Sequence, residues 1–142
     1  MATKLELQQL ALTRLEEVKA LSEKGLYDGA FYLAGYVVEL ALKARICTHL
    51  EVDNYLDSGE ISRSFKTHNL KNLLILSGLQ GKFSREISKN FELLKNWSLI
   101  LDWTAEHRYK LLSSSSRKEL QGIINALDNK NNGVLTWIKK HW

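Results

Sequence analysis

The 142-residue sequence contains no proline and a single cysteine, Cys47, and each scarcity excludes a class of structure. Proline lacks an amide hydrogen and clashes with the preceding helical turn, so its absence favours long helices. One cysteine excludes an intramolecular disulfide framework and a cysteine-based zinc site. We expect Cys47 to be a small buried side chain rather than a reactive thiol.

The sequence also lacks an apolar run long enough to cross a bilayer, which takes about 20 residues. It begins Met-Ala-Thr-Lys-Leu-Glu, a charged pattern without the apolar core of a signal peptide. We therefore expect a cytoplasmic protein with no membrane association. The net charge of +4 is compatible with a nucleic-acid partner but indicates one only weakly, since many basic domains bind no nucleic acid.

The most informative segment is residues 27–50. It is apolar nearly all round, and between Ala30 and Ile46 it carries three charges, at Glu39, Lys43 and Arg45. This pattern is typical of the central helix of a bundle, which neighbours contact on several sides. Charges in such a helix must be paired or must serve a site.

The rest of the chain reads as further helices without strand alternation. Apolar periodicity predicts helices over residues 3–23, about 67–77, 84–103 and 116–138, with a short helical turn at 52–56. We expect Thr67 to cap the short helix, Ser116 and Glu119 to form a capping box, and the last helix to continue through Gly133. The predicted fold is all-α: one domain, residues 1–142, folded as an up-and-down bundle of four long helices and a short one.

Three motifs together resemble the HEPN family of small helical domains from prokaryotic defence and toxin–antitoxin systems. They are the central segment Tyr-Asp-Gly-Ala-Phe-Tyr-Leu-Ala-Gly-Tyr-Val-Val-Glu-Leu-Ala-Leu-Lys-Ala from Tyr27, the run Thr-His-Asn-Leu from Thr67, and Trp103 followed by Arg108 and Tyr109. The resemblance implies a HEPN-like bundle that forms a homodimer with a polar cleft at the interface. It also implies binding of nucleotide, RNA or a partner protein in a defence, stress or toxin–antitoxin system.

In the ribonuclease branch of that family, an arginine is followed four to six residues later by a histidine, and no metal is needed. The histidine moves a proton at the ribose 2′-hydroxyl and the arginine neutralises phosphate charge. Here Arg108 is the counterpart of the arginine, but serines stand where the histidine belongs, and His107 precedes it. The spacing occurs literally only at Arg63 and His68, before the short helix, where the resemblance places no site.

Glu39 and Lys43 have the i, i+4 spacing of a helix ion pair. That pair either orients neighbouring helices or leaves Glu39 to hold Arg108 toward a ligand phosphate. His68 stands at a helix start, where it either caps and packs or contacts an anion.

Trp103 and Tyr109 flank a polar hinge, and such aromatic residues either pack or stack on a nucleobase. The resemblance adds a further option for Tyr109, modification by a small nucleotidyltransferase partner. We expect no cofactor and no metal, because no Gly-rich phosphate loop, metal cluster or deaminase signature occurs.

The favoured role is therefore binding of nucleotide or RNA. The alternative is a divergent, metal-independent endoribonuclease that uses Arg108 with His107 or His68, and a structural or adaptor module remains a third class. The candidate catalytic residues are Arg108, His107 and His68; the candidate ligand-binding residues are Glu39, Lys43, Tyr109, Trp103 and Arg63.

Overall fold

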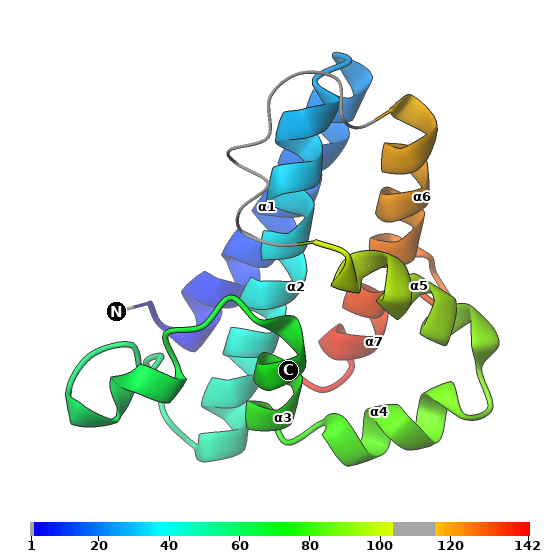
Figure 1. The fold of residues 1–142 in the computed structure, drawn as a ribbon. Helices are drawn as coiled ribbons and strands as arrows, with labels where there is room; N and C mark the ends of the chain where they lie inside the picture. Colours follow the sequence, from blue (N-terminus) through cyan, green and yellow to red (C-terminus); the bar gives the residue numbers. More distant parts are fainter. Residues whose placement is uncertain (1, 104–115) are drawn as a thin grey trace.

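The computed structural model describes residues 2–103 and 116–142, and these residues fold into a bundle of helices (Figure 1). Within this part of the chain there are seven α-helices and one 3-10 helix, and no strand beyond an isolated bridge between Thr3 and Asn54. The prediction of an all-α bundle is confirmed. The helices are more numerous than the four long helices and one short helix expected, because the later ones are divided into shorter helices. No helix in the described ranges is long and apolar enough to cross a membrane.

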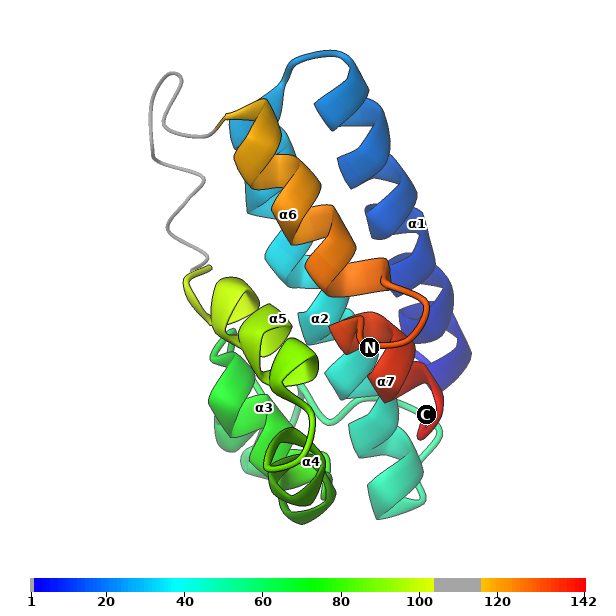
Figure 2. The same cartoon turned by 90° about the vertical axis from the view of Figure 1, so that its right-hand side faces the viewer.

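The first two helices form a long antiparallel hairpin. Helix α1 (Lys4–Glu23) begins with a capping box: the Thr3 hydroxyl accepts from the Glu6 amide at 3.1 Å, and the Glu6 carboxylate accepts from the Thr3 amide at 2.8 Å. Gly25, at a φ of +78°, follows the end of α1. Helix α2 (Tyr27–Leu50) then returns beside α1, as both views show (Figures 1 and 2), and its bounds are those predicted.

Helix α2 is the centre of the core, as its composition predicts. It contacts α1, α3, α6 and α7, and its buried small residues allow those backbones to approach closely. These residues are Ala30, Ala34, Gly35, Ala41 and Ala44. Cys47 is buried as expected, at 1% exposure, and burial raises the pKa of its thiol.

The connection after α2 is irregular apart from the 3-10 helix η1 (Glu60–Ser64), so the helical turn expected at residues 52–56 is wrong. The Lys4 amide donates to the Asp53 carbonyl at 2.9 Å, and the Tyr55 amide donates to the Ala2 carbonyl at 2.9 Å. Residues 53–55 therefore form backbone hydrogen bonds with residues 2–4 in place of a local helical turn.

Helix α3 (Leu70–Leu76) begins two residues later than expected. Asn69, rather than Thr67, is its N-cap, and the Asn69 side chain accepts from the Asn72 amide at 3.0 Å. The Thr67 hydroxyl accepts from the Asn69 amide instead. Gly78, at a φ of +74°, turns the chain after α3, and a Cβ there would also lie 2.5 Å from the His49 ring.

The single helix expected over residues 84–103 is wrong, because the chain breaks it in two. Helix α4 (Gln80–Ile87) ends at the polar run 88–90, and α5 (Phe91–Leu101) starts afresh there. The Asn90 side chain caps α5 by accepting from the Leu93 amide at 3.1 Å, and it donates to Asn132 at 2.9 Å. The new cap turns the chain so that α5 packs against α6.

The prediction of one continuous last helix is also wrong. Helix α6 (Arg117–Asp128) is capped by Ser116, whose hydroxyl accepts from the Glu119 amide at 3.2 Å, and it ends before Asn129. After a turn, α7 (Val134–Lys139) follows Gly133. A Cβ on Gly133 would lie 2.6 Å from the Asn129 amide nitrogen, so the turn folds tightly onto this position.

The arrangement has two parts. Helices α1, α2 and α6 pack lengthwise, and an ion pair between Lys19 and Asp128 (2.9 Å) joins α1 to α6. Among the shorter helices, α3 and α7 pack on α2, whereas α5 packs on α6 and α7, and α4 packs on α5 (Figure 2). Polar groups of α2 therefore emerge where the shorter elements meet it.

Candidate functional site

The carboxylate of Glu39 is the centre of the candidate site. Glu39 is 2% exposed, in the middle of α2. Its Oε1 atom accepts from the Lys43 ammonium at 2.7 Å, and both carboxylate oxygens lie 3.0 Å from Nδ1 of His68. A buried carboxylate is tolerated when it is paired and hydrogen-bonded, and these two partners supply both conditions.

Lys43 is held in place by more than Glu39. Its ammonium lies 5.2 Å from the centre of the Tyr55 ring, within cation–π range. The Tyr55 hydroxyl donates to the Phe65 carbonyl at 2.7 Å. Burial, and then the nearby Glu39, raise the pKa of the Tyr55 phenol well above its usual value. Lys43 is thus fixed between a carboxylate and an aromatic face, and the expected Glu39–Lys43 pair is confirmed.

His68 comes from the connection before α3 and is the exposed member of the cluster. Its side chain is 55% exposed, although Nδ1 touches the buried carboxylate. An ionised carboxylate only accepts hydrogen bonds, so in a neutral ring the contact places the proton on Nδ1 and leaves Nε2 as an acceptor. No hydrogen bond joins Nε2 to another residue in the described ranges. The contact therefore fixes the orientation of the ring, whose side chain remains largely open to solvent.

Aromatic rings extend the cluster along α2. The Tyr36 ring lies edge-to-face with His68, at 6.0 Å between centroids, and with Trp103, at 5.0 Å. Tyr32 continues the row, 5.3 Å from Tyr36. The Trp103 indole lies against Gly35 and donates to the Tyr32 carbonyl at 2.8 Å. Trp103 is 5% exposed, so it supports the site by packing and is not an open stacking surface.

The structure thus brings together four residues singled out in the sequence: Glu39, Lys43, His68 and, through Tyr36, Trp103. His68 does not cap α3; it reaches α2 instead. Arg63 is exposed on η1, and no ion pair or hydrogen bond of its side chain is found among the described residues.

His107, Arg108 and Tyr109 lie outside the described residues. The predicted contact between Glu39 and Arg108, and the modification of Tyr109, therefore remain predictions.

The sequence analysis did not assign Tyr32 and Tyr36 to the site, although their rings extend the cluster. A signal for them exists, since Tyr32, Tyr36, Glu39 and Lys43 follow one another at intervals of four, three and four residues. That spacing places all four on one face of a helix. A face that carries two tyrosines and an ion pair is polar within an otherwise apolar rod.

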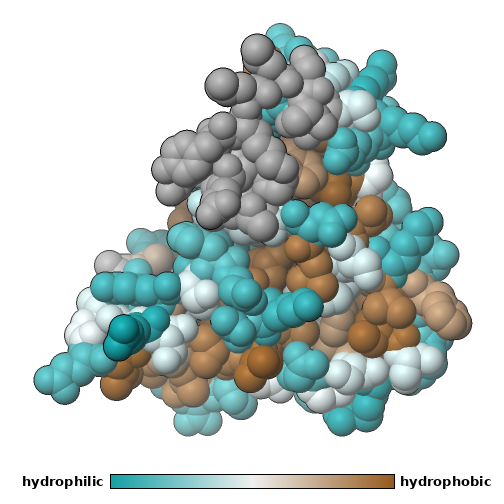
Figure 3. Space-filling view, in the orientation of Figure 1, coloured by the Kyte–Doolittle hydropathy of each residue, from teal (hydrophilic) through white to brown (hydrophobic). Residues whose placement is uncertain are grey.

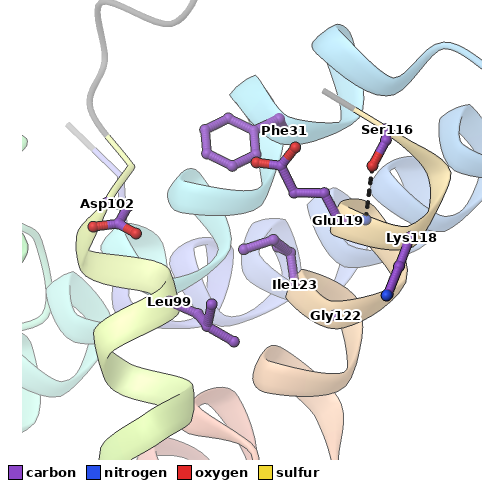
Figure 4. Close-up of a pocket in the computed structure, with 8 residues that line it drawn as sticks. All are labelled: Phe31, Leu99, Asp102, Ser116, Lys118, Glu119, Gly122 and Ile123. Carbon is purple, nitrogen blue, oxygen red and sulfur yellow. Dashed lines mark hydrogen bonds between the residues drawn. The ribbon is translucent and has the colours of Figure 1, made fainter. Parts of the chain in front are cut away.

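A separate pocket of about 380 Å³ lies between α5 and α6 (Figure 4). Phe31, Leu99 and Ile123 give it an apolar surface, and Asp102, Lys118 and Glu119 add charges of both signs. None of the predicted site residues that the structure describes lines it.

Apolar side chains are also exposed on α5. Phe91 is 80% exposed and Leu99 is 36% exposed, and Figure 3 shows apolar atoms in the part of this face that α5 occupies in Figure 1. Within the described ranges no group of three or more metal-ligating side chains occurs.

No protein-family model, curated protein or solved structure matches this chain. The resemblance to the HEPN family therefore rests on the sequence motifs alone.

Proposed function

We propose that this chain is a HEPN-like domain that binds a nucleotide or single-stranded RNA at the cluster of Glu39, Lys43, His68 and Tyr36. The observation that carries the proposal is the contact of the exposed His68 ring with the buried Glu39 carboxylate. A ring held in this way is ordered before a ligand arrives, so binding costs little side-chain entropy.

The chemistry of the cluster suits a nucleoside. The face of an imidazole or phenol ring stacks on any base, and such stacking contributes about 1–3 kcal/mol per base. Nε2 of His68 is an acceptor for a ribose hydroxyl or a base N–H group. The positive charge of Lys43 offsets the negative charge of Glu39, so the cluster does not repel a phosphate.

Binding is tested by the fluorescence anisotropy of a labelled single-stranded RNA. Replacement of His68 by alanine should weaken binding about tenfold, which corresponds to about 1.4 kcal/mol. Asn72→Ala on α3, an exposed position near the site, is the matched control and should leave affinity unchanged. Equal affinities of wild type and His68→Ala would reject the site. If neither RNA nor nucleotide binds, the partner-protein role remains, and exposed Phe91 is the first residue to replace.

The resemblance also leads us to propose a homodimer in a prokaryotic defence, stress or toxin–antitoxin setting. Sedimentation at micromolar concentration tests the dimer. A monomer there would reject a cleft shared between two copies.

A metal-independent endoribonuclease is the second candidate, and the Glu39–His68 contact favours it. Nε2 of His68 would take the proton of a ribose 2′-hydroxyl as that oxygen attacks the neighbouring phosphorus. The bond from phosphorus to the 5′-oxygen breaks, that oxygen takes a proton, and a cyclic phosphate remains on the ribose. Arg108 would neutralise charge on the phosphate, and His107 is the other candidate acid or base.

RNA cleavage in the presence of EDTA tests this candidate. Loss of cleavage in both Arg108→Ala and His68→Ala would support it. If His68→Ala still cuts RNA, loss of cleavage in His107→Ala would identify His107 as the acid or base. Cleavage retained in Arg108→Ala would reject the assignment of the arginine.

A further inference from the structure

We propose a second binding site, for phosphate groups, formed by Arg45, Lys82, Lys140 and His141. It lies where the C-terminal half of α2, the start of α4 and the C-terminal residues converge, in the lower half of Figures 1 and 2. These cations come from segments far apart in the sequence. None of them belongs to the Glu39–His68 cluster.

Arg45 is the fixed element of this site. Its Nε atom donates to the Ser77 carbonyl at 3.2 Å, and its Nη1 atom donates to the His141 carbonyl at 3.0 Å. The guanidinium is half-buried, yet no carboxylate in the described ranges lies within ion-pair distance of it. No hydrogen bond joins its Nη2 atom to a described residue. A guanidinium oriented by two carbonyls keeps donors for an oxyanion.

A chain of ring contacts brings α4 and the C-terminal residues together. The Phe83 and Trp137 rings lie 5.0 Å apart, and Trp137 in turn lies 4.5 Å from the His141 ring. Lys82 precedes Phe83 on α4, and Lys140 precedes His141. The packing of aromatic rings therefore brings α4 beside the C-terminal residues, and the charges of Lys82, Lys140 and Arg45 are close enough to act on the His141 ring.

The electrostatics of the cluster are one-sided. Burial lowers the pKa of His141, and the charges of Lys82, Arg45 and Lys140 lower it further. Lys82 and Lys140 are exposed, and neither forms an ion pair with an acid in the described part of the chain. Mutually repelling cations without acids are stabilised by a bound anion. Guanidinium, ammonium and imidazole groups together match the several oxygens of a phosphate.

Inorganic pyrophosphate is the probe, and the His141 imidazole resonance is the readout, assigned with His141→Gln. At constant ionic strength we expect a saturable shift of that resonance and a raised His141 pKa in the complex, because the anion favours the charged ring. Lys82→Ala combined with Lys140→Ala should weaken the binding at least tenfold. The matched control combines Lys71→Ala with Lys95→Ala, two exposed lysines elsewhere, and should change nothing.

A resonance that does not saturate, or equal loss in both double variants, would overturn the site. The His68 resonance in the same spectra reports on the first cluster, so failure of either site is seen separately.

Single-stranded RNA distinguishes the source of the phosphate. If the site binds the RNA backbone, the Lys82 and Lys140 double variant should reduce the slope of log affinity against log salt by about 0.7 for each phosphate that the variant no longer neutralises. An unchanged slope with retained pyrophosphate binding assigns the site to a free nucleotide or polyphosphate.

Discussion

Nδ1 of His68 lies 3.0 Å from both carboxylate oxygens of Glu39, a residue 29 positions earlier in the chain. The contact joins the irregular connection before α3 to the central helix. It converts an ion pair within one helix, Glu39 with Lys43, into a site that reaches solvent through His68. A histidine oriented by a buried carboxylate is the arrangement that proteins use to fix a tautomer.

The first prediction concerns the Glu39–Lys43 pair. Glu39→Gln should lower the free energy of unfolding by about 1–3 kcal/mol, because the Lys43 ammonium loses its anion in a largely buried place. Urea denaturation measures the effect. In a double-mutant cycle with Lys43→Met, the double variant should lose less stability than the sum of the two single losses, by about 0.5–3 kcal/mol. Strict additivity would show that the two side chains do not stabilise one another.

The second prediction concerns the packing of Trp103 on Gly35. A Cβ at position 35 would lie 1.8 Å from the indole, so Gly35→Ala must displace Trp103 and break its bond to the Tyr32 carbonyl. We expect a loss of about 1–3 kcal/mol, with a change in tryptophan fluorescence. Gly122→Ala is the matched control: it lies in α6 with no atom within 4 Å of the new Cβ, and should stabilise by about 0.5–1 kcal/mol. Two substitutions with equal effects would contradict the packing.

The third prediction follows from the raised pKa of Tyr55. The unfolded phenol ionises near its usual pKa of about 10, whereas the buried phenol stays protonated well above that pH. The contribution of the protonated Tyr55 phenol to the free energy of unfolding is therefore complete below about pH 10. As the pH rises beyond that, this contribution is lost by up to about 1.4 kcal/mol per pH unit. Tyr55→Phe lacks this loss, because it has no ionisable group. Urea denaturation at pH 9 and pH 11 should show that wild type loses stability relative to Tyr55→Phe at the higher pH. An equal difference in the free energy of unfolding between the two proteins at both pH values would contradict the burial of this phenol.

The sequence predicted the bounds of α1 and α2 well, and both ends of α1 have a local cause. Thr3 and Glu6 supply the start of α1, and Gly25 its end. The small-residue pattern of α2 requires neighbours on several sides wherever those neighbours come from.

The later helices were predicted too long for a physical reason. Apolar phase continues across residues 88–90 and across 129–133, but Asn90 caps a new helix and the asparagines of the two segments bind one another. Asn90 caps α5 and donates to Asn132, while Asn129 accepts from the amides of Asn131 and Asn132. Periodicity alone does not distinguish a continuous helix from two helices whose apolar faces happen to align. The cluster of asparagines before Gly133 was the available signal.

The candidate site was predictable only in part. The i, i+4 spacing of Glu39 and Lys43 is local and is read directly from the sequence. The approach of His68 is not, because it depends on the path of the irregular connection, which backbone pairing of Asp53 and Tyr55 with the chain start fixes. A contact of that kind needs tertiary structure.

The most direct test of the proposed site is the nitrogen-15 spectrum of the His68 ring during titration with single-stranded RNA or nucleotide. We predict that Nδ1, the nitrogen that faces Glu39, carries a proton, and that the Nε2 resonance moves and saturates as ligand is added, while Asn72 resonances stay in place. A ring protonated at Nε2, or an Nε2 resonance unmoved by a ligand that does bind, would contradict it.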